Sequence, residues 1–276
     1  MSSQNGIIPR LQTFTSLQSS RIRKRTQVIG FNMQQILSIK VPEAWQSLDN
    51  DQLRFVFHLL SREYSLPQIK SLCLLKWAKI HVLYREGAVF IVKHKGKRYP
   101  LTALQVTEAS EALKWLGDVP GYPVRLTRIG FHRPVRADFQ DVTFGDFLAL
   151  DNLYQGYLQT RRSDLLAEMA KIMYQSNRIH LDAEEEINIF YWFTSVKQMF
   201  GNMFRHFFKS ATTDESMPSS PSLQQLQESM NTQIRALTGG DITKEKEVLS
   251  MDCWRALTEL DAKAKDYEDI RKTAKP

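Results

Sequence analysis

The sequence predicts an α+β protein: a helix-dominated body with a small antiparallel sheet, followed by a short C-terminal helical appendage. Three short segments, 80–83, 88–94 and 98–101, are rich in strand-forming residues and are joined by the turn-like tripeptides REG and KGK. From residue 143 onward, apolar residues recur mostly at helical spacing. The polar stretch SATTDESMPSSPS at 210–222 then separates the body from the appendage.

Capping residues mark most of the predicted helix boundaries. Asp49 with Gln52, and Asp182 with Glu185, have the spacing of a capping box. Further helix starts and ends are predicted at Ser65, Gly117, Thr143, Ser163, Gly239–Gly240 and Ser250. Strands are also predicted at 35–41 and, within a loop rich in proline and glycine, at 124–129.

The segment FYWFTSVKQMFGNMFRHFF, residues 190–208, contains eight aromatic side chains in nineteen positions. At 3.6 residues per turn, one face collects a set of apolar side chains: Phe193, Val196, Phe200, Met203, Phe204 and Phe207. Charged residues such as Lys197 and Arg205 interrupt the run, which excludes a membrane-spanning helix. Three alternatives remain for this face: the protein's own core, a docking surface for another chain, or an in-plane membrane helix.

Composition predicts a folded, soluble protein in a reducing compartment. Of the 276 residues, 42% are hydrophobic and 24% are charged, as in ordinary globular domains. Cys73 and Cys253 are far apart and form no CxxC motif, and there is no signal-like or eighteen-residue apolar segment. We therefore expect a cytoplasmic protein with no membrane partner.

The net charge of +7 is distributed unevenly along the chain. Residues 1–32 carry five basic side chains and no acidic one, which leaves +2 for the remaining residues. Arg23, Lys24 and Arg25 lie at the centre of this leader, which resembles a flexible basic arm for nucleic acid or an acidic partner. Alternatively, the protein begins at Met33, directly before the first predicted strand, and the leader has no role.

Four segments follow from these patterns: a basic leader at 1–32, a body at 33–209, a linker at 210–222 and an appendage at 223–276. A two-helix appendage of this size is too small to hold a core of its own. It must therefore dock either on the body or on another protein. Trp254 and Leu257 lie on the apolar face of its last helix.

Catalytic and cofactor-binding motifs are absent from the sequence. It contains no GxGxxG, GxxxxGK[ST], HExxH or GxSxG, and its six histidines show no metal-ligand spacing. The acidic run in HLDAEEE (180–186) suits the first turn of a helix, and GGDITKEKE lacks the glycine spacing of a phosphate loop. We expect no enzyme activity, no cofactor and no metal site.

One basic cluster, VKHKGKRY at 92–99, is a candidate phosphate-binding surface. On an extended hairpin Lys93, Lys95 and Lys97 would share a face near Arg98. Arginines of the following loop could extend this surface: Arg125, Arg128, Arg133 and Arg136. Lysines on an edge hairpin also protect a sheet from aggregation, so this alternative stays open.

Two stretches resemble proteins from the tail and assembly gene clusters of phages and prophages. They are KVPEAWQSLDNDQLRFVFHLLSREYSLPQIKSLCLLKW (40–77) and RALTGGDITKEKEVLSMDCWRALTEL (235–260). Residues 235–260 are similar to the C-terminal ends of tail assembly chaperones. Tail chaperones are usually smaller, and the sheet-containing body departs from their pattern. The resemblance implies a non-enzymatic protein of a bacterial host, cytoplasmic or associated with the virion, that binds phage structural proteins or itself.

We therefore expect a chaperone- or connector-like assembly protein of the tail module. The residues expected to bind partners are Phe193, Phe200, Phe204, Phe207, Trp254 and Leu257. The alternative is a nucleic-acid-binding accessory protein that uses the leader and the hairpin. Its residues would be Arg23, Lys24, Arg25, Lys93, Lys95, Lys97 and Arg98.

Overall fold

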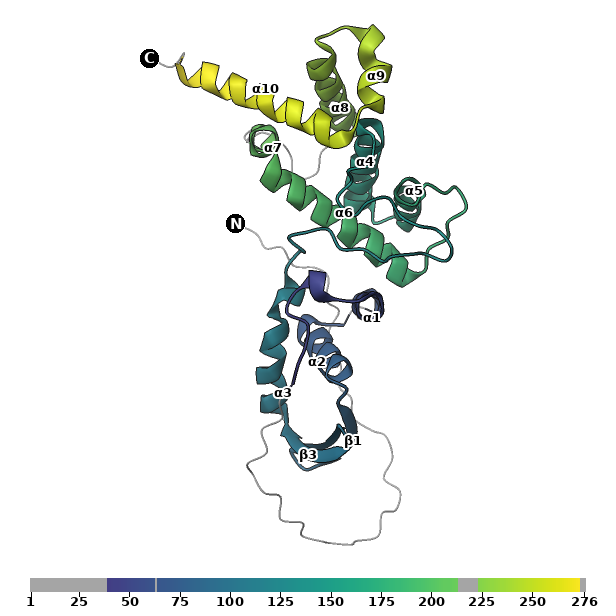
Figure 1. Ribbon diagram of the computed structural model, residues 1–276, viewed down its shortest axis with the longest axis vertical. Coiled ribbons are helices and arrows are strands. Elements are labelled where there is room, and N and C mark those ends of the chain that lie inside the picture. The colour runs from purple at the N-terminus through teal and green to yellow at the C-terminus, as the bar shows by residue number, and fades with distance from the viewer. Residues whose placement is uncertain (1–38, 63, 213–222, 274–276) are drawn as a thin grey trace. The chain divides into compact units, whose positions relative to one another are not determined.

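The computed structural model describes residues 39–62, 64–212 and 223–273, and they confirm a helix-dominated α+β fold (Figure 1). The chain forms two compact units. The described part of the first consists of residues 39–42 and 64–114, and that of the second consists of 43–62 together with the described residues from 115 onward. The 1–32 leader and residues 213–222 of the expected linker lie outside the described ranges.

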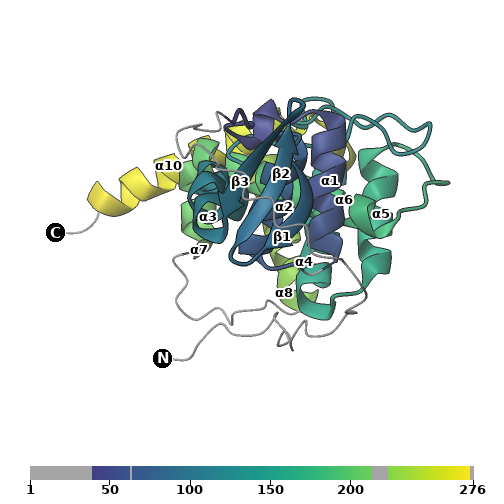
Figure 2. The same cartoon turned by 90° about the horizontal axis from the view of Figure 1, so that it is seen from below.

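The first unit contains a three-stranded antiparallel sheet in the order β1 (His81–Glu86), β2 (Val89–His94) and β3 (Lys97–Thr102) (Figure 2). Side chains of one sheet face form a small core, with Val92 and Leu101 against Leu75 of α2 (Leu66–Trp77) and Val106 of α3 (Ala103–Ser110). The strand predictions in this region are confirmed to within a few residues. Residues 39–41 are not in a strand, so the described end of the predicted 35–41 strand is wrong.

The turn between β2 and β3 is as short as a hairpin allows. His94 pairs with Lys97, which leaves Lys95 and Gly96 as the two turn residues. Both have positive φ, 48° and 82°, and such backbone favours glycine or a turn-tolerant residue. The KGK tripeptide therefore forms the turn that its sequence predicts.

The second unit is helical and is built around α6 (Ala183–Met203), whose residues pack against α1, α5 and α7. The α-helices around α6 are α1 (Asn50–Ser61), α4 (Phe144–Thr160), α5 (Ser163–Met173), α7 (Arg205–Thr212), α8 (Leu223–Thr238), α9 (Glu245–Ser250) and α10 (Cys253–Thr273). Short 3-10 turns occur at η1 (Trp45–Ser47) and η3 (Ile242–Lys244), and η2 (Glu111–Gly117) follows α3 where the chain passes between the units.

Several predicted caps are confirmed. The Asp49 carboxylate accepts from the Gln52 N–H at 2.8 Å, and the Asp182 carboxylate accepts from the Glu185 N–H at 2.8 Å. The predictions for Ser163 and Ser250 are wrong by a few residues. Ser163 is the first residue of α5, because Arg161 already turns the chain with a φ of 58°. Ser250 ends α9, and Asp252 accepts from the Arg255 N–H at 3.0 Å where α10 begins.

The predicted strand at 124–129 is a loop held by side chains of distant helices. The Leu126 N–H donates to Oδ1 of Asn188 at 2.8 Å, and the Thr127 N–H donates to Oδ1 of Asn50 at 2.9 Å. These amide side chains satisfy backbone groups that a neighbouring strand would otherwise bind. The buried Ile129 forms an isolated bridge with His132, and Phe131 between them is exposed.

The C-terminal helices dock on the body. Ile234, Val248 and Leu260 belong to the same buried core as residues of α4 and α6. The Cys253 N–H donates to the carbonyl of Val142 at 3.0 Å and fixes the start of α10. Of the two alternatives for the appendage, the structure therefore shows docking on the chain itself, and no separate core begins at residue 223.

Candidate partner-binding surfaces

The aromatic face of α6 is part of the core. Phe193 and Phe200 have no exposed surface, and Phe204 is buried. Phe147 of α4 and Trp254 of α10 each lie edge-on to Phe200, with ring centroids 5.5 Å apart. Packing of this kind leaves no room for another chain. Of the three alternatives for this face, the structure therefore shows the protein's own core.

Two residues of the C-terminal helix are also engaged internally. Leu257 is fully buried in the same core. The indole N–H of Trp254 donates to the carbonyl of Asp138 at 2.7 Å, so this side chain ties α10 to the loop before α4. The expectation that Phe193, Phe200, Phe204 and Leu257 form a docking face is thus corrected: their apolar spacing builds the core.

An apolar groove remains at the other end of α10. It has a volume of about 790 Å³ and lies among α7, α8 and α10. Its apolar lining comes mainly from Ala236, Leu260, Ala264 and Tyr267, together with Phe207. Polar and charged residues complete the lining: Thr232, Gln233, Lys263, Glu268 and Arg271.

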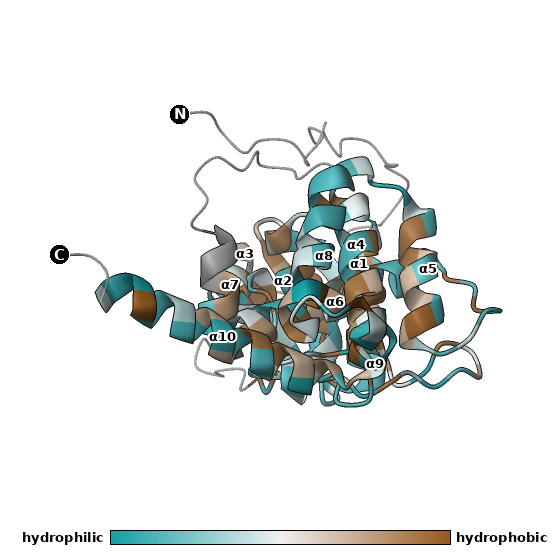
Figure 3. Ribbon diagram, turned by 90° about the horizontal axis from the view of Figure 1, so that it is seen from above, coloured by the Kyte–Doolittle hydropathy of each residue, from teal (hydrophilic) through white to brown (hydrophobic). Residues whose placement is uncertain are grey.

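The groove exists because the apolar stripe of α10 continues beyond the helices that cover it. Leu257 and Leu260 are buried and Ala264 is half-buried, whereas Tyr267 is 70% exposed. Ile270, one turn further on, is 65% exposed. In Figure 3 a hydrophobic band interrupts the hydrophilic outer turns of α10. These turns therefore present large apolar side chains to solvent.

Polar contacts hold the walls of the groove together. Nζ of Lys263 donates to the carbonyl of Ala236 at 2.9 Å and joins α10 to α8. A side-chain contact of 3.2 Å between Nδ1 of His206 and Oε2 of Glu268 joins α7 to α10. The groove is thus a built feature of the second unit with cations and an acid along its rim.

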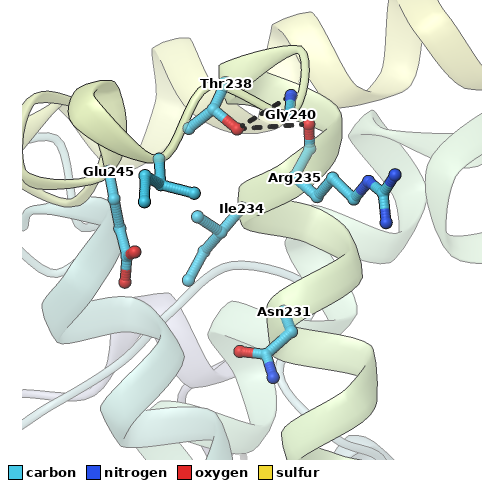
Figure 4. A pocket seen from close by; sticks show the side chains of 7 residues that line it. Asn231, Ile234, Arg235, Thr238, Gly240 and Glu245 are labelled. Atoms are coloured by element: carbon cyan, nitrogen blue, oxygen red, sulfur yellow. Dashed lines mark hydrogen bonds between the residues drawn. The ribbon is translucent and has the colours of Figure 1, made fainter.

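A smaller pocket of about 300 Å³ lies beside the glycine pair after α8 (Figure 4). Gly239 and Gly240 have φ values of 65° and 87°, and the Gly240 N–H donates to the carbonyl of Arg235 at 3.2 Å. This is the bonding pattern that ends a helix with a glycine. The two glycines therefore end α8. The pocket beside them is lined by one acidic and one basic residue, Glu245 and Arg235.

The basic hairpin residues are exposed, but their arrangement differs from the prediction. Lys93 of β2 lies directly opposite Arg98 of β3, whereas Lys97 lies opposite His94. Successive residues of a strand point to opposite faces, so Lys93 and Arg98 share one face and Lys97 points to the other. The expectation that Lys93, Lys95 and Lys97 share a face is wrong, because Lys95 is in the turn.

The arginines of the 118–142 loop belong to the second unit. The Arg125 guanidinium lies 5.3 Å from the ring centre of Trp192, and burial lowers its pKa from the ordinary value despite nearby acids. Arg136 pairs with Asp138 through two nitrogens at 3.2 and 3.3 Å. These two side chains are therefore engaged within the unit, while Arg128 and Arg133 are exposed. Arg23, Lys24 and Arg25 lie outside the described residues.

The described parts of the two units differ in net charge, and the net charge of the whole chain does not show this difference. The described part of the first unit has ten lysines and arginines against three glutamates, a net charge of +7. In the described part of the second unit, 21 basic residues are set against 24 acidic ones, a net charge of −3. A charge count restricted to residues 64–114 would have found this signal in the sequence.

Among the residues placed by the structure, no group of three or more His, Cys, Asp or Glu could hold a metal ion. None of the helices described is long and apolar enough to cross a membrane. Comparisons with protein-family models, with curated proteins and with solved structures each found no match.

Proposed function

We propose that this chain is a non-enzymatic assembly protein that binds other proteins, and that it acts in the tail module of a phage or prophage. The observation that carries the binding role is the apolar groove among α7, α8 and α10, with the exposed Tyr267 and Ile270 at its end. The tail assignment is supported by the resemblance of residues 235–260, which include the groove-lining residues Ala236 and Leu260, to the ends of tail assembly chaperones.

The groove fits an amphipathic helix of a partner protein. Its apolar strip follows α10 at helical spacing, through Leu260, Ala264 and Tyr267. A partner helix with apolar residues three and four positions apart could cover this strip. Lys263, Glu268 and Arg271 along the rim offer charges of both signs, which suits a helix whose polar flanks also carry both signs.

The chain's own linker is chemically a poor occupant. Residues 210–222 contain one large apolar side chain, Met217, among serines, threonines and prolines. The leader is a better competitor because it contains Ile7, Ile8, Leu11 and Phe14. A chain that starts at Met33 removes this competitor, so that only a second molecule can supply the occupant.

The test is co-expression of the tagged chain with individual tail proteins encoded beside it, followed by capture and a wash in about 1 M NaCl, which screens surface charges within ~3 Å. The chain starting at Met33 should retain at least one tail protein. The double variant Tyr267→Asp and Ile270→Asp should lose it, because it places charge on the apolar strip.

Lys265→Asp is the matched control, since it adds an acid to an exposed position of the same helix outside the groove lining. It should retain the partner as the unchanged chain does. Equal retention by the groove variant, or retention of no tail protein by the unchanged chain, contradicts the proposal.

A further inference from the structure

We infer that the turn end of the sheet in the first unit binds single-stranded nucleic acid, whose phosphates contact Lys93 and Arg98 on one face and, around the turn at Lys95, Lys97 on the other. This site lies in a different unit from the groove and does not depend on it. Three observations support the inference: the concentration of positive charge in the first unit, the cross-strand pairing of Lys93 with Arg98, and the absence of salt bridges to the hairpin cations among the described residues.

The first observation is the concentration of charge. The described residues of the first unit, fewer than sixty, carry the net +7, whereas the larger second unit is slightly negative. Four of its ten basic side chains occupy six consecutive positions, 93–98. Such a cluster of lysines and arginines on one part of the surface is typical of proteins that bind the phosphate groups of nucleic acids.

The second observation is the alignment of basic residues across the strands. Lys93 lies directly opposite Arg98 on one side and His81 of β1 on the other. Like charges directly opposite each other on a sheet are destabilising, so the pairing of Lys93 with Arg98 does not serve the stability of the fold. An anion lying across this pair would remove the repulsion.

Edge protection does not account for this pairing. Lysines guard sheets when they lie on an edge strand. In the order β1-β2-β3, however, Lys93 is on the central strand β2. This strand is already paired with β1 on one side and with β3 on the other, so it has no free edge at which another chain could add. Protection against aggregation could therefore explain the position of Arg98, which is on the edge strand β3, but not that of Lys93.

The third observation is the absence of internal partners within the part of the chain that the structure describes. There, the four hairpin cations are exposed and form no salt bridge. Some cations of the second unit, by contrast, are paired: Lys171 pairs with Glu168 at 2.6 Å, and Lys197 pairs with Asp151. The hairpin charges are thus available to an external anion.

An exposed tyrosine beside this pair favours a single strand over a duplex. Tyr84 pairs with Ile91, two residues before Lys93, and therefore lies on the same face of the sheet. Its side chain is 49% exposed. Aromatic rings next to a basic track stack on unpaired bases, which a duplex does not offer.

The experiment measures fluorescence anisotropy of a labelled oligothymidylate of about twenty nucleotides. It is titrated with the full chain in which the five basic residues of the leader are replaced by glutamine, so that their charge does not contribute. Four phosphate contacts predict that log K falls with log salt with a slope of about −2.8, or about 50-fold between 50 and 200 mM NaCl. A duplex of the same length should bind more weakly.

In the variant with Lys93→Gln, Lys95→Gln, Lys97→Gln and Arg98→Gln, affinity should fall by at least ~10-fold and the salt dependence should nearly vanish. Tyr84→Ala should weaken binding by about 5-fold or more without changing the slope. The matched control removes four exposed cations of the second unit: Arg178→Gln, Lys246→Gln, Arg255→Gln and Lys265→Gln. It should bind as the unchanged chain does.

Unchanged binding by the hairpin variant overturns the inference, and so do equal losses in both four-fold variants, since these would reflect net charge alone. Tighter binding of the duplex overturns the assignment to a single strand. Thermal unfolding checks that the hairpin variant is folded. The groove variant Tyr267→Asp with Ile270→Asp should bind the oligonucleotide normally, which separates failure here from failure of the proposed assembly role.

Discussion

Lys93 and Arg98 lie directly opposite each other on neighbouring strands, and both side chains are exposed. A sheet selected for stability alone would place an acid or a β-branched residue opposite a lysine. The hairpin instead keeps two cations side by side at its turn end. This pair makes the first unit less stable than its fold allows, and the loss is measurable.

Arg98→Thr should therefore stabilise the protein. Removing the repulsion and adding a β-branched residue is expected to raise the free energy of unfolding by about 0.2–1 kcal/mol at low salt. Urea denaturation in low-salt buffer measures the change. The gain should shrink in about 1 M NaCl, where screening already weakens the repulsion. A variant less stable than the original at low salt contradicts this prediction.

Asn188→Leu should destabilise the second unit. Asn188 is fully buried, and its Oδ1 accepts the Leu126 N–H at 2.8 Å. Leucine has a similar size but leaves that buried N–H without a partner, which costs about 1–3 kcal/mol. Urea unfolding followed by tryptophan fluorescence measures the loss. Arg128→Ala, at an exposed position of the same loop, should stay within about 0.5 kcal/mol.

Phe200→Ala tests whether the aromatic face is core. Phe200 has no exposed surface and contacts the rings of Phe147 and Trp254. Its truncation should lower the free energy of unfolding by about 3–5 kcal/mol. Ile270→Ala, on the exposed end of α10, should change it by less than about 0.5 kcal/mol. Similar small effects at both positions would mean that the face of α6 is not packed.

The two thiols should be unreactive in the folded protein. Burial raises the pKa of Cys73 to about 12, against the lowering effect of Lys76, and burial likewise raises the pKa of Cys253 to about 12. Unfolded cysteine has a pKa of about 8.5, so these groups favour folding below that pH. This contribution is lost as pH rises from about 8.5 toward 12.

A thiol reagent added near pH 8 should consequently modify neither cysteine until the surrounding unit opens. Cys253→Ala leaves a thiol that reports on the first unit, and Cys73→Ala leaves one that reports on the second. Both should react promptly in urea. Rapid modification of either thiol under native conditions would show that its burial is incomplete.

Local signals in the sequence predicted much of the fold. The capping boxes at Asp49 and Asp182 depend on residues three positions apart, and the turn at Lys95–Gly96 depends on two adjacent residues. Long-range relationships were not visible. Nothing near residue 126 shows that its N–H will bond to Asn188, and so a strand was predicted where a loop lies.

The candidate surfaces illustrate the same limit. An apolar stripe is required both for a core helix and for a docking helix, so spacing alone could not place Phe200 inside and Tyr267 outside. That distinction depends on where α7 and α8 stop covering α10. Likewise, the sequence identified the lysines of the hairpin, but the strand order was needed to place Lys93 on a central strand.

The most direct test of the groove as a protein-binding site is hydrogen–deuterium exchange of the full chain, alone and bound to a tail protein captured with it. We predict that the partner slows exchange in residues 260–273 of α10 and in residues 232–236 of α8, and leaves the β2–β3 hairpin unchanged. Protection confined to the hairpin, or an α10 that exchanges equally with and without the partner, would contradict the assignment of the groove.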